Sequence, residues 1–212
     1  MKKTREKPKI VLIGDYGSGK TSFIQKLVFD FFETGHIPTI GAAINKVMLN
    51  ENSYTFWDTA GQERYKSLVR LYYRQCHCVF IFYNMNDPSS HLNIINWIDT
   101  LDNFVDSSVP VVIIGTKSDM KQSEEIDYNH EAISDACSKI NLIAKITISN
   151  KIDSSDDIFN KIKYSLEKAS EYARNYGDSE ELVILSEPDS YWNVFKQYIN
   201  TFMPTYDTGC CF

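Results

Sequence analysis

The residues most suited to chemistry lie close to the N-terminus. They form a glycine-rich run that fits the pattern G-x-x-x-x-G-K-[ST], with one further serine behind it. In this pattern the glycines let backbone N–H groups turn toward phosphate oxygens, the lysine reaches the β- and γ-phosphates, and the last hydroxyl binds Mg²⁺. An apolar strand pattern precedes the run and a helical pattern follows it, so we predict a nucleotide-phosphate site here. The run starts at Gly14 and continues through Asp15, Tyr16, Gly17, Ser18, Gly19, Lys20, Thr21 and Ser22.

A second run follows another strand pattern directly, at Trp57-Asp58-Thr59-Ala60-Gly61-Gln62-Glu63-Arg64-Tyr65. Together with Ile40-Gly41-Ala42-Ala43-Ile44 and Leu71-Tyr72-Tyr73-Arg74, it strongly resembles the Rab branch of the Ras superfamily of small GTPases. The resemblance covers roughly residues 9–171, and its switch segments look closest to those of endocytic Rabs. It implies that the chain binds GTP or GDP with Mg²⁺ and hydrolyses GTP slowly.

The resemblance also assigns roles to single residues. Thr39 would bind Mg²⁺ through its hydroxyl, beside Thr21, and the γ-phosphate through its N–H group. Asp58 would hold Mg²⁺ through water, and the Gly61 N–H group would contact the γ-phosphate. Gln62 resembles the residue that orients the attacking water, and because no arginine finger is evident, we expect hydrolysis to need an activator.

The resemblance implies that Thr39 and Gly61 lie on two surface loops, each attached to the γ-phosphate. Loss of that phosphate would release both loops, so that partners could distinguish the two nucleotide states. The partners that the resemblance implies are an exchange factor, a GTPase activator, effectors that touch the switch regions, and a Rab escort protein or dissociation inhibitor.

Tyr16 departs from the family pattern. It occupies a position near the γ-phosphate where the superfamily often has a small residue. Its ring could crowd the attacking water or the activator's arginine, or it could turn outward into solvent. Together with Thr116 and an altered second base loop, both described below, the first alternative leads to a second functional hypothesis, a pseudo-GTPase scaffold of the same fold with impaired cycling.

A candidate base site, Thr116-Lys117-Ser118-Asp119, follows an apolar strand pattern where the family has N-K-x-D. Asp119 is suited to accept hydrogen bonds from the N1–H and 2-amino groups of guanine, which adenine cannot match, and this disfavours an ATP-using enzyme. Lys117 would lay its alkyl stem on the base, and Phe32 would pack against it. Thr116 lacks the amide of the usual asparagine. One such hydrogen bond contributes about 0.5–1.5 kcal/mol, so we expect weaker affinity with guanine preference retained.

The family's second base loop, S-A-K, has two possible matches. Ser149-Asn150-Lys151 fits if one deletion is allowed, and Ile148-Ser149-Asn150 fits without one. The first is preferred because it keeps a serine and a lysine in their roles. In either register the central backbone N–H group could contact the guanine oxygen.

The elements that must position these residues follow from hydrophobic periodicity. Apolar β-branched runs alternate with helical patterns, which predicts an α/β fold with a six-stranded, mostly parallel sheet and helices on both faces. The glycine-rich motif and the family resemblance imply that this fold is of the P-loop NTPase type. A short polar segment at 50–53 predicts that the second and third strands form an antiparallel hairpin at the sheet edge. The expected strands are 10–14, 44–49, 54–57, 79–83, 111–115 and 143–149, and the expected helices are 20–29, 65–75, 92–104, 129–140 and 156–174.

Composition bounds the remaining possibilities. The net charge of -6 argues against a nucleic-acid binder that neutralises phosphates along a backbone. Five cysteines without an export signal indicate reduced cytosolic thiols, and Cys76 and Cys78 are expected to be buried side chains because no second ligand pair exists. We expect an N-terminal arm at 1–8, a small GTPase domain at 9–174 and an acidic tail at 175–212.

The chain ends in Gly209-Cys210-Cys211-Phe212, which lacks a C-a-a-X box but resembles the Rab signal for double geranylgeranylation. Two lipids would anchor the chain stably, and we expect it to cycle between the cytoplasm and the cytosolic face of endomembranes. Aromatic residues recur at helical spacing within 189–203. They could form an amphipathic helix on a membrane or a partner, or pack back on their own domain.

Overall fold

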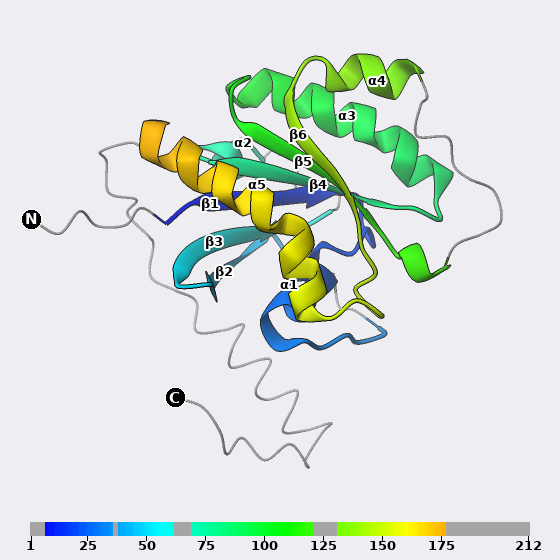
Figure 1. Cartoon of the computed structure of the whole chain (residues 1–212). Helices are drawn as coiled ribbons and strands as arrows, with labels where there is room; N and C mark the ends of the chain where they lie inside the picture. Colours follow the sequence, from blue (N-terminus) through cyan, green and yellow to red (C-terminus); the bar gives the residue numbers. More distant parts are fainter. Residues whose placement is uncertain (1–6, 36–37, 62–68, 121–130, 177–212) are drawn as a thin grey trace, which may run out of the picture. The chain divides into compact units, whose positions relative to one another are not determined.

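The protein is built on one sheet with strand order β2-β3-β1-β4-β5-β6 (Figure 1). The computed structural model describes residues 7–35, 38–61, 69–120 and 131–176. All neighbouring strands pair in parallel except β2 and β3, which are antiparallel, so the predicted mostly parallel sheet is confirmed. The strands are β1 (Lys9–Gly14), β2 (Ala42–Leu49), β3 (Asn52–Thr59), β4 (Cys78–Asn84), β5 (Pro110–Thr116) and β6 (Asn141–Thr147).

The hairpin at the sheet edge is confirmed, but its connection is shorter than predicted. Only Asn50 and Glu51 form the turn, with φ values of 45° and 64°. Two consecutive residues with positive φ are typical of a tight hairpin turn whose twist matches that of the strands. The prediction of a polar connection through residue 53 was therefore wrong, because Ser53 pairs with Met48 in the ladder.

Helices cover both faces of the sheet, as predicted. One hydrophobic cluster joins α1 and α5 to one face, and a second joins α3 and α4 to the other. Strand β1 shows the division most clearly, since Ile10 and Leu12 belong to the first cluster while Val11 and Ile13 belong to the second. The helices are α1 (Lys20–Phe29), α2 (Val69–Tyr73), α3 (Pro88–Phe104), α4 (Glu131–Cys137) and α5 (Ser155–Tyr176), with a 3₁₀ turn at Ser118–Met120.

Capping groups explain why α3 and α5 begin before their apolar patterns. The Asp87 side chain accepts a hydrogen bond from the Ser89 N–H group at 2.9 Å, and Pro88 occupies the first turn, so α3 starts four residues before the predicted Leu92. At α5, Ser154 and Asp157 cap each other, with the Ser154 hydroxyl 2.7 Å from the Asp157 carboxylate.

Two predicted helices are shorter in the described part of the chain. The structure shows helix only at Val69–Tyr73 and Glu131–Cys137, and residues 62–68 and 121–130 lie outside the described part. Beyond Tyr73, Gln75 has a φ of 54°, which ends the helical path before the predicted residue 75.

Strand β6 ends at Thr147, two residues before the predicted end. The Ile148 N–H group donates to the Gly115 carbonyl at 2.8 Å, after which the Ser149 N–H group donates to the Asp153 carboxylate at 2.9 Å. The side-chain bond turns the chain out of the sheet, so Ser149 lies in a loop beside the end of β5.

The carboxyl ends of β1, β5 and β6 lie at one edge of the sheet, because these strands run parallel. The loops that follow them carry the predicted phosphate and base residues, which is where ligands bind in open α/β sheets. Cys76 and Cys78 are buried, as predicted. Among the described helices, none combines the length and the apolar character needed to cross a bilayer.

Candidate functional site

The glycine-rich run that starts at Gly14, called the phosphate loop from here on, surrounds the buried side chain of Lys20. Lys20 Nζ donates to the carbonyls of Gly14 at 2.8 Å and Asp15 at 2.9 Å, and lies 3.3 Å from Ser18 Oγ. Burial lowers the pKa of Lys20 to about 8, an effect that the negative charges of Asp58 and Asp15 oppose. Gly14 must be glycine, because an added Cβ would lie 2.1 Å from the Phe82 carbonyl oxygen. The ammonium group therefore sits under the loop, at the start of α1.

Three oxygen-bearing side chains converge beside Lys20. Thr21 Oγ1 donates to Asp58 Oδ2 at 2.8 Å and lies 3.0 Å from Thr39 Oγ1. Asp58 is only 2% exposed, and its Oδ1 has no hydrogen-bond partner among the described residues. Burial raises the pKa of Asp58 to about 6, while the Thr21 bond and Lys20 lower it, so a carboxylate is present at neutral pH. Two hydroxyls beside a carboxylate oxygen without a partner form a donor set that fits Mg²⁺.

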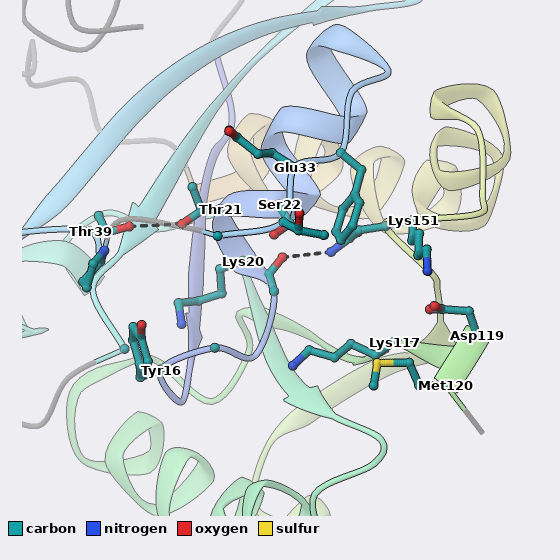
Figure 2. Close-up of a pocket in the computed structure, with 18 of the residues that line it drawn as sticks. Tyr16, Lys20, Thr21, Ser22, Glu33, Thr39, Lys117, Asp119, Met120 and Lys151 are labelled. Atoms are coloured by element: carbon teal, nitrogen blue, oxygen red, sulfur yellow. Dashed lines mark hydrogen bonds between the residues drawn. The ribbon is translucent and has the colours of Figure 1, made fainter. Parts of the chain in front are cut away.

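A pocket of about 400 Å³ extends from this cluster to the base loops. Figure 2 shows Tyr16, Lys20, Thr21 and Thr39 at one end, and Asp119 and Lys151 at the other. Lys117 extends from the Asp119 end toward the phosphate loop (Figure 2). The predicted residues that line the pocket are Tyr16, Gly17, Gly19, Lys20, Thr21, Ser22, Phe32, Thr39, Gly61, Lys117, Asp119, Asn150 and Lys151.

Asp15 and Ser18 do not line the pocket. The Asp15 carboxylate accepts hydrogen bonds from Trp97 Nε1 at 2.9 Å and Asn93 Nδ2 at 3.1 Å, so it faces α3. Ser18 is 1% exposed and contacts Lys20 from within the loop. Any contact of Asp15 with a nucleotide is therefore left to its backbone, and its side chain anchors the phosphate loop to α3.

The two predicted base loops, which follow β5 and β6 and carry Asp119 and Ser149, are joined by a hydrogen bond. Ser149 Oγ donates to Asp119 Oδ1 at 2.7 Å and also lies 3.1 Å from the Ile152 N–H group. Ser149 is 2% exposed and Asp119 is partly exposed, so the serine end of this bond is buried while the carboxylate reaches the pocket. Ile148, the first residue of the alternative register, is fully buried in the core. Of the two registers, Ser149-Asn150-Lys151 thus places its serine beside Asp119, the carboxylate that is predicted to bind the base.

The base loops also reach back to the phosphate loop. Thr116 is fully buried, and its Oγ1 donates to the Ser18 carbonyl at 2.7 Å. Asn150 Nδ2 donates to the Gly19 carbonyl at 3.0 Å. Loops that follow β1, β5 and β6 thereby form one hydrogen-bonded unit beneath the pocket.

Gly61 approaches the phosphate loop very closely. A Cβ atom at Gly61 would lie 2.5 Å from the Tyr16 backbone nitrogen and 2.6 Å from the Asp15 carbonyl oxygen. Only glycine permits this approach. The Tyr16 side chain lines the pocket nearby and is 62% exposed.

The sequence analysis missed several residues that line the pocket. Most belong to the segment between Phe32 and Thr39, whose ends were both predicted, so the intervening residues could have been inferred from them. Gln62, Cys210, Cys211 and the aromatic segment within 189–203 lie outside the described residues. The missed lining residues are Glu33, Thr34, Gly35, Pro38, Thr59 and Met120.

Much of the chain is similar to known proteins. Residues 9–167 match the model of the Ras family. The chain is similar to the Ras and EF-hand domain-containing protein of Danio rerio, with 37% identity over 53% of this chain and 18% of that protein. It is also similar to the Ras-related protein RabC of Dictyostelium discoideum, with 32% identity over 57% of this chain and 64% of the relative. Human Ras-related protein Rab-15 is 31% identical over 56% of this chain and 58% of its own length. The matched part thus spans less than two thirds of each of these relatives.

Proposed function

Because the chain belongs to the Ras family of small GTPases, we propose that it is a molecular switch that binds GTP and GDP and hydrolyses GTP slowly. The observation that carries this proposal is that one pocket has side chains suited to a phosphate chain at one end and side chains suited to a guanine base at the other. Lys20 and the Thr21, Thr39 and Asp58 oxygens suit a Mg²⁺-bound phosphate chain at one end, and Asp119 suits guanine at the other.

At the phosphate end, Lys20 and the backbone of the loop bind the phosphate oxygens. Thr21, Thr39 and Asp58 would hold Mg²⁺, which supplies positive charge to the β- and γ-phosphates. Thr39 and Gly61 lie on two separate surface loops, and the N–H group of each contacts the γ-phosphate when GTP is bound. Hydrolysis removes that shared attachment, so both loops relax and the surface that partners touch changes.

At the base end, Asp119 reads the N1–H and 2-amino groups of guanine. Ser149 orients the carboxylate, and Lys117 lays its stem along the base. This hydrogen-bond pattern excludes adenine, because adenine N1 is an acceptor. The switch is therefore selective for guanine nucleotides despite the threonine at position 116.

The finer assignment within this proposal is a Rab-type role in vesicle and membrane trafficking. It is supported by the resemblance of the switch segments to those of Rabs and by the similarity of the chain to RabC and Rab-15. In this role an exchange factor, a GTPase activator and effectors bind the switch regions, and an escort protein or dissociation inhibitor binds the prenylated form. Geranylgeranyl groups on Cys210 and Cys211 anchor the chain to the cytosolic face of endomembranes, from which it cycles to the cytoplasm.

A second candidate function is a pseudo-GTPase scaffold. Tyr16 favours it, because this residue lines the pocket at the end that holds Lys20, and its backbone nitrogen lies where Gly61 approaches the loop. A ring at this position can exclude the attacking water or an activator's arginine from the γ-phosphate. The scaffold would hold GTP without turning it over.

The test is to identify the nucleotide retained after purification and then measure phosphate release from GTP, alone and with a broad-specificity activator. Limited proteolysis of the GDP form and of a form loaded with a non-hydrolysable GTP analogue reports on the two loops. A switch should show nucleotide-dependent cleavage, and Thr39→Ala should reduce the difference by removing the hydroxyl beside Thr21. Identical cleavage in both states would refute switching. Retained but unhydrolysed GTP would favour the scaffold.

A further inference from the structure

Two side chains from different base loops meet above Gly19. A Cβ atom added at Gly19 would lie 3.1 Å from Asn150 Nδ2 and 3.3 Å from both Cγ2 and Oγ1 of Thr116. Asn150 donates to the Gly19 carbonyl at 3.0 Å, and Thr116 donates to the neighbouring Ser18 carbonyl at 2.7 Å. The two side chains therefore hold consecutive carbonyls of the phosphate loop and occupy adjoining space.

The side-chain amide of Asn150 is only 5% exposed, yet not all of its hydrogen-bonding groups have partners among the described residues. Its Oδ1 has no hydrogen-bond partner within the described part of the chain. Gly19 accepts only one of the two N–H bonds that Nδ2 can donate. Leaving a buried polar group unsatisfied is unfavourable, so an incomplete amide in the lining of a pocket points to a polar ligand.

We propose that Asn150 supplies the base-site amide that Thr116 lacks. The family motif N-K-x-D begins with asparagine, where this chain has Thr116. The family motif S-A-K has alanine at its centre, where this chain has Asn150. Asn150 holds the phosphate loop through Gly19 and presents its free N–H bond to the acceptor edge of guanine, formed by N7 and O6. In this way Asn150 slows nucleotide release.

The inference rests on the proposed function, because it requires a guanine nucleotide in the pocket. The test measures release of a fluorescent GDP analogue, with Mg²⁺ present, from the full chain and from three variants. Asn150→Ala should release the nucleotide about 3- to 10-fold faster, the range expected for one lost hydrogen bond. Thr116→Asn alone should also release it faster, because two amides would crowd the space above Gly19.

The double variant, Asn150→Ala with Thr116→Asn, is the decisive measurement. An asparagine at 116 then has the vacated space, so release should return to within about 2-fold of the original rate, a strongly non-additive result. A purely structural role of Asn150 in its loop would not be rescued in this way. Ile152→Ala is the matched control, because this neighbouring side chain is 70% exposed and its backbone bond to Ser149 is retained.

Either of two outcomes would overturn the inference while leaving the proposed function intact. In the first, the original chain binds the GDP analogue but Asn150→Ala releases it at an unchanged rate. In the second, the double variant releases it at least as fast as Asn150→Ala. Failure of the original chain to bind the analogue at all would overturn the proposed function, and this inference with it.

Discussion

The hydroxyl of Ser149 donates a 2.7 Å hydrogen bond to the carboxylate of Asp119, joining the loops that follow β6 and β5. Asp119 lines the pocket at the end opposite Lys20, whereas Ser149 is almost completely buried and supports the carboxylate from behind. The bond leaves the second Asp119 oxygen and the remaining lone pairs for a ligand. It therefore fixes the orientation of the Asp119 carboxylate.

Ser149→Ala should weaken guanine nucleotide binding without changing the preferred base. The variant removes one hydrogen bond from Asp119, so we expect GDP to dissociate about 3- to 10-fold faster. Stopped-flow release of a fluorescent GDP analogue measures this. Ser170→Ala, on α5, is the matched control, because its hydroxyl bonds only to the Leu166 carbonyl. Equal rates for Ser149→Ala and the original chain would contradict a positioning role for Ser149.

Asp119→Asn should shift the nucleotide preference toward xanthine. Asparagine replaces one carboxylate acceptor with an N–H donor, which pairs with the additional carbonyl of xanthine and repels the guanine 2-amino group. We expect GDP affinity to fall by about 10-fold or more, on the scale of one or two hydrogen bonds. Competition between xanthosine and guanosine diphosphates measures the preference. An unchanged order of affinities would refute the base-site assignment.

Removal of Mg²⁺ should accelerate GDP release. Chelation leaves the buried Asp58 carboxylate and the phosphates without a neutralising cation, so we expect release to be about 10-fold faster or more, given a difference of at least 1.4 kcal/mol. Release with and without a chelator gives the ratio. Thr21→Ala should reduce that ratio, because it removes the hydroxyl between Asp58 and Thr39.

A threonine far from the cluster provides the comparison for this measurement. Thr100 on α3 is partly exposed, and its hydroxyl donates to the Asn96 carbonyl. Thr100→Ala should respond to the chelator like the original chain. An equal response of Thr21→Ala would argue against a metal at these oxygens.

Tyr16→Ser should increase GTP hydrolysis. The tyrosine lines the phosphate end of the pocket, and a smaller side chain leaves more room for the attacking water and an activator's arginine. We expect about 10-fold or more in the presence of an activator, whose arginine carries most of the stabilisation in this reaction. Phosphate release under single-turnover conditions measures the rate. Tyr164→Ser, at an exposed position on α5, controls for loss of a surface ring. Should Tyr16→Ser hydrolyse GTP no faster, the outward-turned ring would be the better interpretation.

Lys9 should make the stability of the protein increase with pH in the alkaline range. Its ammonium group lies 4.0 Å from the centre of the Trp57 ring and donates to the Arg74 carbonyl, and burial lowers its pKa to about 8 from 10.5. Between these two values the unfolded chain binds a proton that the native chain has released, so the free energy of unfolding rises with pH. Below about pH 8 both states are protonated and this contribution is constant.

Lys9→Met isolates that contribution from the rest of the chain. The methionine side chain is similar in length to the aliphatic stem of lysine and is likewise apolar, but it has no titratable group. Denaturant unfolding at several pH values from 7 to 11 should therefore show a smaller rise for the variant than for the original chain, with the difference confined to about pH 8–10.5. Parallel curves for the two proteins would show that Lys9 is not the titrating group.

The order of elements and the phosphate loop could be predicted from the sequence because their signals are local. A strand, a glycine-rich turn and a helix that begins at Lys20 are contiguous, and each is recognisable from its own residues. The antiparallel hairpin was likewise indicated by a short polar segment. Element ends were less predictable, as at α3, because the Asp87 cap lies outside the apolar pattern that marks the helix.

Tertiary structure decided which side chains share the site. Asp15 belongs to the phosphate loop by sequence, yet its carboxylate faces Trp97 on α3. Asn150 was predicted only through its backbone, yet its side chain holds the phosphate loop at Gly19. Such contacts join residues far apart along the chain. They depend on strand order and on how loops leave the sheet. Periodicity and motif spacing describe only neighbours in sequence, so such contacts cannot be predicted from them.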